Sequence, residues 1–197
     1  MDQYRGHPAN PSIYYRYDDA TQFHTAFPTT ALCITAWAAN CRIEVNYPEH
    51  IQPLWDYQRT VTRGAAQVNV TCTQAGCHNP QNAAGVTVMP AGNLDLTSSM
   101  SVDVPQETTS YRQLLFPHTI SIMGTNGQPQ QVSVGPYMTA GAANGGLSAT
   151  FLNRFAPGSG STHAGYLSAA ELRLVSEWLD IGAQYFNNPW DPAVPLN

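Results

Sequence analysis

The stretch that most constrains this 197-residue chain is Cys72-Thr73-Gln74-Ala75-Gly76-Cys77-His78, where a histidine directly follows the second of two cysteines. Two thiols can form thioethers with the vinyl groups of a haem, and the imidazole can then bind the iron. The usual attachment motif has two residues between the cysteines. Here there are four, so we expect the loop to bulge. The motif predicts one covalently attached haem c, held by Cys72, Cys77 and His78.

Two other interpretations of this peptide stay open from the residues alone. The three side chains could form half of a zinc site, but structural zinc takes four ligands and no second Cys/His pair lies at a matching spacing. Cys72 and Cys77 could also form a disulfide beside an incidental histidine. Haem attachment is the interpretation that uses all three side chains.

The overall composition argues against two classes of partner. The formal net charge is -5, the eight basic residues are all arginines, and no basic run is present, which argues against nucleic-acid binding. No stretch approaches the roughly 20 apolar residues of a membrane span. The first residues also lack the basic and apolar regions of a secretory signal.

The attachment chemistry bears on the cellular compartment. Haem thioethers are made outside the bacterial cytoplasm, so we expect a periplasmic or extracellular protein and, before residue 1, a signal or a longer polypeptide. Cys33 and Cys41 fit the same compartment as a disulfide that closes a short loop. Two free thiols buried as small hydrophobic groups are the alternative.

The sequence divides into three parts. Residues 1–42 mix aromatic residues with prolines and suit an irregular arm that packs its rings onto a haem edge or a neighbouring subunit. Residues 43–190 form the predicted haem domain, and residues 191–197 form a tail. An ordinary ordered terminus is the alternative for the arm.

Local patterns predict several short elements in these parts. A capping box, Ser168-Ala169-Ala170-Glu171, begins a helix with one apolar face that should end near Asn187. Asn126-Gly127 lies between two alternating apolar segments and predicts a β-hairpin. Shorter helices are expected in the ranges 30–40, 46–55, 106–115 and 145–154, and a loop or short strand over 60–71.

This order of helix, haem peptide, loop and final helix resembles a class I c-type cytochrome domain. Three motifs resemble the cytochrome c domains of planctomycete proteins: His50-Ile51-Gln52-Pro53, Leu94-Asp95-Leu96, and the segment from Leu167 to Ala183. The segment from Thr162 to Tyr185 is also similar to the carboxy-terminal region of hydrazine-synthase-alpha-like proteins. The resemblance covers residues 43–190. It implies a mainly α fold, with cytochrome-c-like helices around one covalently bound haem, long loops and a small β-hairpin.

The family usually supplies a methionine before the last helix as the sixth iron ligand, and this sequence departs from that pattern. His163 stands at the corresponding place. Because a neutral imidazole is a good iron ligand, we expect bis-histidine coordination by His78 and His163. Met138 is the main alternative, and His50, His118 or an open position also stay open.

The leading functional prediction is a monohaem cytochrome that carries single electrons to redox partner proteins, rather than a catalyst. One alternative is a haem domain or subunit of a multi-protein redox enzyme, as the hydrazine-synthase resemblance implies, with His50, His118 and Tyr137 as acid/base groups beside an open iron position. Another is a homo-oligomer or extracellular filament built through the aromatic arm.

Overall fold

The computed structural model describes residues 24–187 except 37, 40 and 126, and every structural statement below concerns these residues. Predictions for residues 1–23 of the arm and for residues 188–197, including the tail, lie outside them. The elements follow in the order α1 (Ala31–Thr35), the π-helical turn η1 (Tyr47–Ile51), α2 (Gln52–Asp56), β1 (Arg59–Arg63), β2 (Ala66–Val70), the 3₁₀ turn η2 (Ala91–Asn93), α3 (Thr109–Leu115), β3 (His118–Met123), β4 (Pro129–Val134), α4 (Gly146–Asn153) and α5 (Ala169–Asp180).

The predicted mainly α, cytochrome-c-like fold is wrong. Helix takes 27% and strand 16% of the described residues, and the strands form two separate antiparallel pairs, β1–β2 and β3–β4. Only α5, with 12 residues, exceeds eight residues. The 15 glycines and 15 prolines divide the chain into segments too short for long helices. The structure is therefore a small helical core with loops and two hairpins, rather than a bundle of helices around a cofactor.

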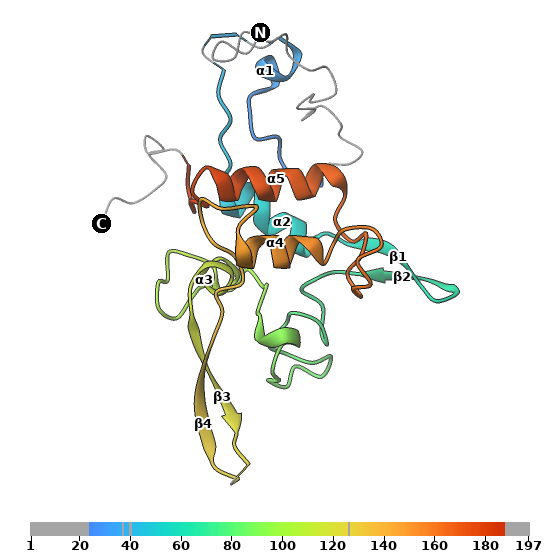
Figure 1. Cartoon of the computed structure of the whole chain (residues 1–197), viewed down its shortest axis with the longest axis vertical. Helices are drawn as coiled ribbons and strands as arrows, with labels where there is room; N and C mark the ends of the chain where they lie inside the picture. Colours follow the sequence, from blue (N-terminus) through green and yellow to red (C-terminus); the bar gives the residue numbers. More distant parts are fainter. Residues whose placement is uncertain (1–23, 37, 40, 126, 188–197) are drawn as a thin grey trace.

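The core lies where η1 and α2 meet α5, with α3 and α4 beside them (Figure 1). Tyr47 of η1 is fully buried, and its ring centroid lies 5.3 Å from that of Trp178 on α5 and 5.1 Å from that of Tyr111 on α3. Aromatic pairs at these separations stabilise a core beyond their buried area. The other fully buried apolar side chains include Val45, Ile51, Leu54, Trp55, Leu114, Met138, Leu174, Val175 and Leu179.

The predicted capping box is present at the start of α5. The Ser168 hydroxyl accepts from the Glu171 amide, and the Glu171 carboxylate accepts from the Ser168 amide. The helix ends at Asp180, seven residues before the predicted end at Asn187. Gly182 has a φ of 105° and Ala183 a φ of 50°, so the backbone turns into left-handed conformations that end a helix.

The two hairpins extend from this core in different directions (Figure 1). The predicted hairpin around Gly127 is confirmed: β3 and β4 pair from His118 opposite Val134 to Met123 opposite Pro129. The second hairpin, β1–β2, replaces the expected loop or short strand over 60–71 and turns at Gly64, whose φ is 62°. The β1–β2 hairpin leads directly into the Cys72–His78 peptide.

The described part of the arm contains α1 and extends from the core on the side opposite to β3–β4 (Figure 1). Cys33 and Cys41 form a disulfide, with an S–S distance of 2.02 Å and a separation of eight positions in the sequence. The Glu44 N–H donates to the Pro28 carbonyl, and this hydrogen bond joins the two chain segments at the base of the loop. Among the described residues, no helix is long and apolar enough to span a membrane.

Candidate functional site

The Cys72–His78 peptide is a closed loop held by its own backbone. The His78 N–H donates to the Cys72 carbonyl at 2.9 Å, and the Cys77 N–H donates to Gln74 at 3.0 Å. Gly76, with a φ of 82°, supplies the left-handed turn that this closure needs. The two additional residues of the motif are thus absorbed in a turn, and both cysteines are free thiols in the structure.

The side chain of His78 is held by the segment that follows. Its Nδ1 atom lies 3.1 Å from the Leu94 carbonyl oxygen. A carbonyl only accepts, so Nδ1 carries the proton and the lone pair remains on Nε2. The Leu96 N–H also donates to the His78 carbonyl at 3.0 Å. Leu94 and Leu96 therefore fix both the backbone and the ring of His78, in the way that outer hydrogen bonds orient metal-ligating histidines.

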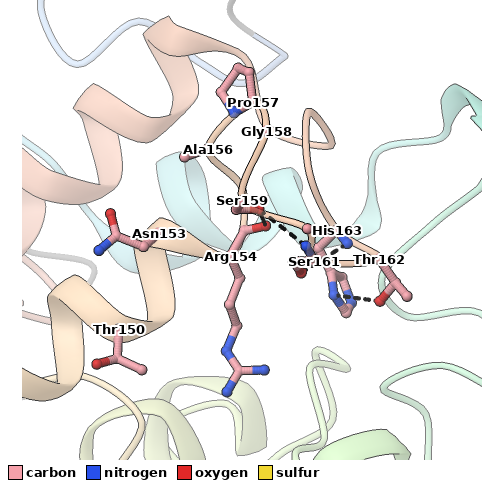
Figure 2. Close-up of a pocket in the computed structure, with 11 residues that line it drawn as sticks. Thr150, Asn153, Arg154, Ala156, Pro157, Gly158, Ser159, Ser161, Thr162 and His163 are labelled. Atoms are coloured by element: carbon pink, nitrogen blue, oxygen red, sulfur yellow. Dashed lines mark hydrogen bonds between the residues drawn. The ribbon is translucent and has the colours of Figure 1, made fainter.

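His163 lies on the loop between α4 and α5, which is held by a chain of hydrogen bonds (Figure 2). The Ser161 hydroxyl accepts from the His163 amide at 3.1 Å, and the Ser159 hydroxyl accepts from the Ser161 amide at 3.3 Å. Ser159 in turn donates to the Arg154 carbonyl at 3.1 Å. The His163 Nδ1 atom contacts the Thr162 hydroxyl at 3.3 Å. Hydrogen bonds within this Ser- and Gly-containing loop thus support the His163 imidazole.

The structure brings His78 and His163 together across a crevice. Their ring centroids lie 5.8 Å apart, with 36° between the ring planes. One metal bound by both rings would separate the centroids by about 6 Å, given bonds of about 2 Å. The enclosed part of the crevice measures about 120 Å³ and is lined by Cys72, His78, Gly92, Leu94, Leu96, Tyr137, Phe151, Arg154, Phe155 and His163.

The enclosed part alone is too small for a porphyrin, since cofactor pockets measure about 300–1,000 Å³. Two open hollows adjoin it at His163. One, of about 830 Å³, is lined by the α4–α5 loop, and the other, of about 950 Å³, is lined by β1, Cys77 and His78. A planar group bound between the two histidines would extend from the enclosed part into these hollows.

Both histidines are electrostatically suited to binding a metal. Burial lowers the pKa of His78 below its ordinary value. Burial also lowers the pKa of His163, and the neighbouring His78, Arg154 and Arg63 lower it further. Each ring is therefore neutral at pH 7, which is the form that coordinates a metal.

The other ligand candidates lie elsewhere. Met138 is fully buried in the core and is not among the described residues that line the crevice. His50 is buried, with Nδ1 3.0 Å from the Asn46 amide nitrogen and Nε2 3.3 Å from the Phe27 carbonyl. His118 lies 3.1 Å from the Asn93 carbonyl through Nε2.

Of the three acid/base groups considered for catalysis, only Tyr137 lines the crevice, and its hydroxyl donates to the Gly92 carbonyl at 2.7 Å. The structure does not bring His50 or His118 to it.

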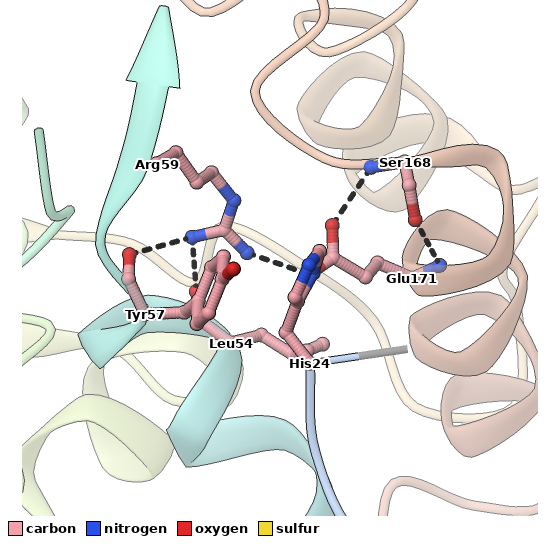
Figure 3. A network of polar contacts seen from close by, with 6 residues as sticks. All are labelled: His24, Leu54, Tyr57, Arg59, Ser168 and Glu171. Atoms are coloured by element: carbon pink, nitrogen blue, oxygen red, sulfur yellow. Dashed lines mark hydrogen bonds and ion pairs between the residues drawn. The ribbon is translucent and has the colours of Figure 1, made fainter. Parts of the chain in front are cut away.

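A buried ion pair joins Arg59 of β1 to Glu171 of α5 (Figure 3). Arg59 Nη2 lies 2.8 Å from Glu171 Oε1, and the side chains are 7% and 1% exposed. His24 Nδ1 donates to the same carboxylate oxygen at 2.9 Å. Burial raises the pKa of the Cys72 thiol to about 11, and the Arg59 charge opposes part of that increase. The network thus places a cation near the buried thiol.

Sequence reasoning missed three contributors to the site. Leu94 acts through its carbonyl, and Gln52 donates through Nε2 to the Leu96 carbonyl at 3.0 Å, which secures the segment that holds His78. Arg154 lines both the crevice and the adjoining hollow. The motifs at 50–53 and 94–96 mark two of these positions in the sequence, but no pattern marks Arg154.

Comparison of the chain with protein-family models, with curated proteins and with solved structures finds no match in any of the three. In the part of the chain that the structure describes, no group of three or more His, Cys, Asp or Glu side chains is arranged to hold a metal ion. The crevice between the two histidines and the two thiols beside it are therefore the features that indicate a function.

Proposed function

We propose that this protein is a c-type haem protein that carries single electrons, with His78 and His163 as the two axial ligands. The observation that carries the proposal is the pair of imidazoles 5.8 Å apart, one of them directly after two free thiols. The thiols and the proximal imidazole come from one peptide, and the second imidazole comes from a loop more than 80 residues later. This arrangement supplies every protein group that covalent attachment and six-fold coordination of haem require.

Each residue has a separate part in this proposal. The Cys72 and Cys77 S–H groups add across the two vinyl groups, so two C–S bonds form and the hydrogens go to the vinyl carbons. Haem bound in this way supplies a one-electron change at iron. His78 and His163 would hold the iron and so exclude small ligands, while Leu94 and Leu96 keep the His78 ring in place.

The predicted partners and location follow from this proposal. Electron transfer implies redox partner proteins, and thioether formation implies a periplasmic or extracellular location. Two imidazoles favour a lower reduction potential than a histidine and a methionine would give.

Haem attachment is tested by coexpression of the full chain with a bacterial cytochrome c maturation system. We expect a mass gain of one haem and a pyridine haemochrome spectrum of the c type. Cys72→Ala with Cys77→Ala is the matched control and should lose the covalent haem. A wild-type chain that gains no haem, or that forms a Cys72–Cys77 disulfide instead, would contradict the proposal.

The axial ligands are tested on the attached protein. His163→Ala should convert the low-spin spectrum to a high-spin or mixed spectrum and allow carbon monoxide to bind the ferrous form. Met138→Leu is the control and should leave the low-spin spectrum unchanged, because Met138 is buried in the core. An unchanged low-spin spectrum in His163→Ala would eliminate the assignment. High-spin haem in the wild type would favour a catalytic site instead.

A further inference from the structure

The residues that line the enclosed crevice and the two adjoining hollows have an unbalanced charge. Arg154 lines two of these spaces and Arg63 lines the third, whereas no Asp or Glu is among the described residues that line any of them. The whole chain has a formal net charge of -5, so this local excess of positive charge runs against the overall balance. A group of cations without anions beside an apolar crevice indicates that the bound group brings negative charge.

Arg154 is the cation whose guanidinium is available. It follows the last residue of α4, and among the described residues its hydrogen bonds are made by its backbone N–H and carbonyl. No ion pair joins its side chain to any residue in the part of the chain that the structure describes. In Figure 2 its side chain extends from the loop on the same side as the His163 ring. Arg154 also lines the crevice together with His78 and His163, so it borders the same space as both imidazoles.

Apolar side chains line the enclosed crevice beside Arg154. Phe151 and Phe155 are buried, and Leu94 and Leu96 are each 3% exposed. An arginine beside such a wall can bind a carboxylate through two parallel hydrogen bonds, and a low local dielectric strengthens that contact. The planar part of a porphyrin suits the apolar wall, and its two propionates are its only anionic groups.

We propose that Arg154 binds a propionate carboxylate of the haem and so determines which way round the porphyrin enters the crevice. The inference rests on the proposed function. Arg154 is a binding residue for the cofactor edge, distinct from the residues that hold the iron and the vinyl groups.

Arg63 provides a matched control. It is also an arginine beside His163, but its Nε and Nη2 atoms donate to the Tyr166 hydroxyl at 3.1 and 2.6 Å. It lines the hollow that contains Cys77, on the side where a vinyl group would be attached. If positive charge acts in a general way, variants of Arg63 and Arg154 should lose porphyrin affinity equally. If Arg154 makes a specific contact with a carboxylate, only variants of Arg154 should lose affinity.

The experiment uses the full chain prepared without haem attachment, titrated with ferric protoporphyrin IX and, separately, with its dimethyl ester. The ester keeps the planar ring and iron but has no carboxylate. We expect the wild type and Arg63→Gln to bind the acid at least about tenfold more tightly than the ester, the change that one charge-assisted hydrogen bond gives. Arg154→Gln should bind the two with equal affinity, and Arg154→Lys should retain part of the difference.

A second measurement on the haem-attached protein covers the case in which Arg154→Gln does not fold without haem. An unpaired propionate stabilises ferric over ferrous iron, so Arg154→Gln should lower the midpoint potential more than Arg63→Gln does. Equal potentials in the two variants, or a tenfold preference for the acid that survives Arg154→Gln, would overturn the inference.

The outcomes also separate this inference from the proposed function. A wild type that binds acid and ester equally well refutes the role of Arg154 and leaves haem binding intact. A wild type that binds neither porphyrin refutes both.

Discussion

His78 and His163 are supported in different ways. His78 is oriented by the Leu94 carbonyl and by a backbone bond from Leu96. His163 depends on the hydroxyls of Ser159 and Ser161 in its loop. Backbone groups persist through most substitutions and hydroxyls do not. The position of the His78 ring should therefore be less sensitive to mutation of its neighbours than the position of the His163 ring.

Cys72 should be the less reactive of the two thiols in the chain without haem. It is 8% exposed and its pKa is raised to about 11, so little thiolate is present at pH 8, whereas Cys77 is partly exposed. Iodoacetamide at pH 8 should alkylate Cys77 first, and the rate at Cys72 should rise about tenfold per pH unit toward pH 11. Peptide mass spectrometry measures both rates.

Unfolding in urea is the control for that experiment, because it should make the two rates equal. Faster alkylation of Cys72 than of Cys77 in the folded chain would contradict the described burial.

At the residue scale, the sequence relates the Cys72–His78 side chains to one another but not to their surroundings, and haem attachment stays a prediction. Cys72, Cys77 and His78 are adjacent in the chain, so spacing alone relates them. The approach of His163 to His78 was expected only from its place before the last helix. Arg154 could not be predicted, because a single arginine after a helix has no pattern that separates a binding role from a solvent-exposed one.

At the scale of elements, α5 contains a carboxyl group with an unusual titration. Burial and the neighbouring Asp180 raise the pKa of Glu177 from 4.5 to about 7, and its buried Oε2 atom has no hydrogen-bond partner among the described residues. Between pH 4.5 and about 7 the folded state holds a proton that the unfolded state has released. The free energy of unfolding should therefore fall as the pH rises through this range.

Glu177→Gln should remove this part of the pH dependence and make the protein more stable than the wild type at pH 8. Urea unfolding at pH 5 and pH 8 measures the difference. Asp103→Asn, at an exposed position outside the core, should leave the wild-type profile unchanged. A Glu177→Gln variant that still loses stability between pH 5 and pH 8 to the wild-type extent would count against Glu177 as the cause.

Elements with a local chemical signal were predictable, and those that depend on partners were not. The Ser168 capping box and the hairpin turn before Gly127 each specify their structure within a few residues. The β1–β2 hairpin has weak alternation and turns at Gly64, so the sequence predicts only a loop or a short strand there. The end of α5 depends on left-handed conformations at Gly182 and Ala183, of which only the glycine carries a sequence signal.

At the scale of the whole molecule, one buried network joins three distant parts of the chain. Glu171 of α5 bonds Arg59 of β1 and His24 of the arm (Figure 3). Glu171→Ala should lower the free energy of unfolding by about 3–5 kcal/mol, because it leaves the buried Arg59 charge without its carboxylate partner. His24→Ala should cost less, since the Arg59–Glu171 pair remains and His24 is 25% exposed. Chemical denaturation of the full chain measures both.

Equal losses of unfolding free energy in Glu171→Ala and His24→Ala would contradict the expectation that Glu171→Ala costs more. Limited proteolysis adds a second readout, because His24→Ala should expose the arm to cleavage while the core resists.

The fold class was mispredicted because the motifs that resemble a cytochrome are local and the architecture is not. The segments at 50–53, 94–96 and 167–183 occur in the expected order, yet the chain between them forms loops, two hairpins and only the short helices α3 and α4. A capped amphipathic helix packs equally well in many architectures. Its partners, here Tyr47 and Tyr111, are brought together by non-local packing that no spacing in the sequence shows.

The β3–β4 hairpin extends well away from the core and contains no Asp, Glu, Lys or Arg between residues 118 and 134 (Figure 1). None of its residues lines the crevice. Exposed turns of this kind accept inserted segments. The turn between Met123 and Pro129 is therefore the natural attachment point for an affinity tag or a surface anchor, through which the protein could be immobilised on an electrode with its two histidines undisturbed.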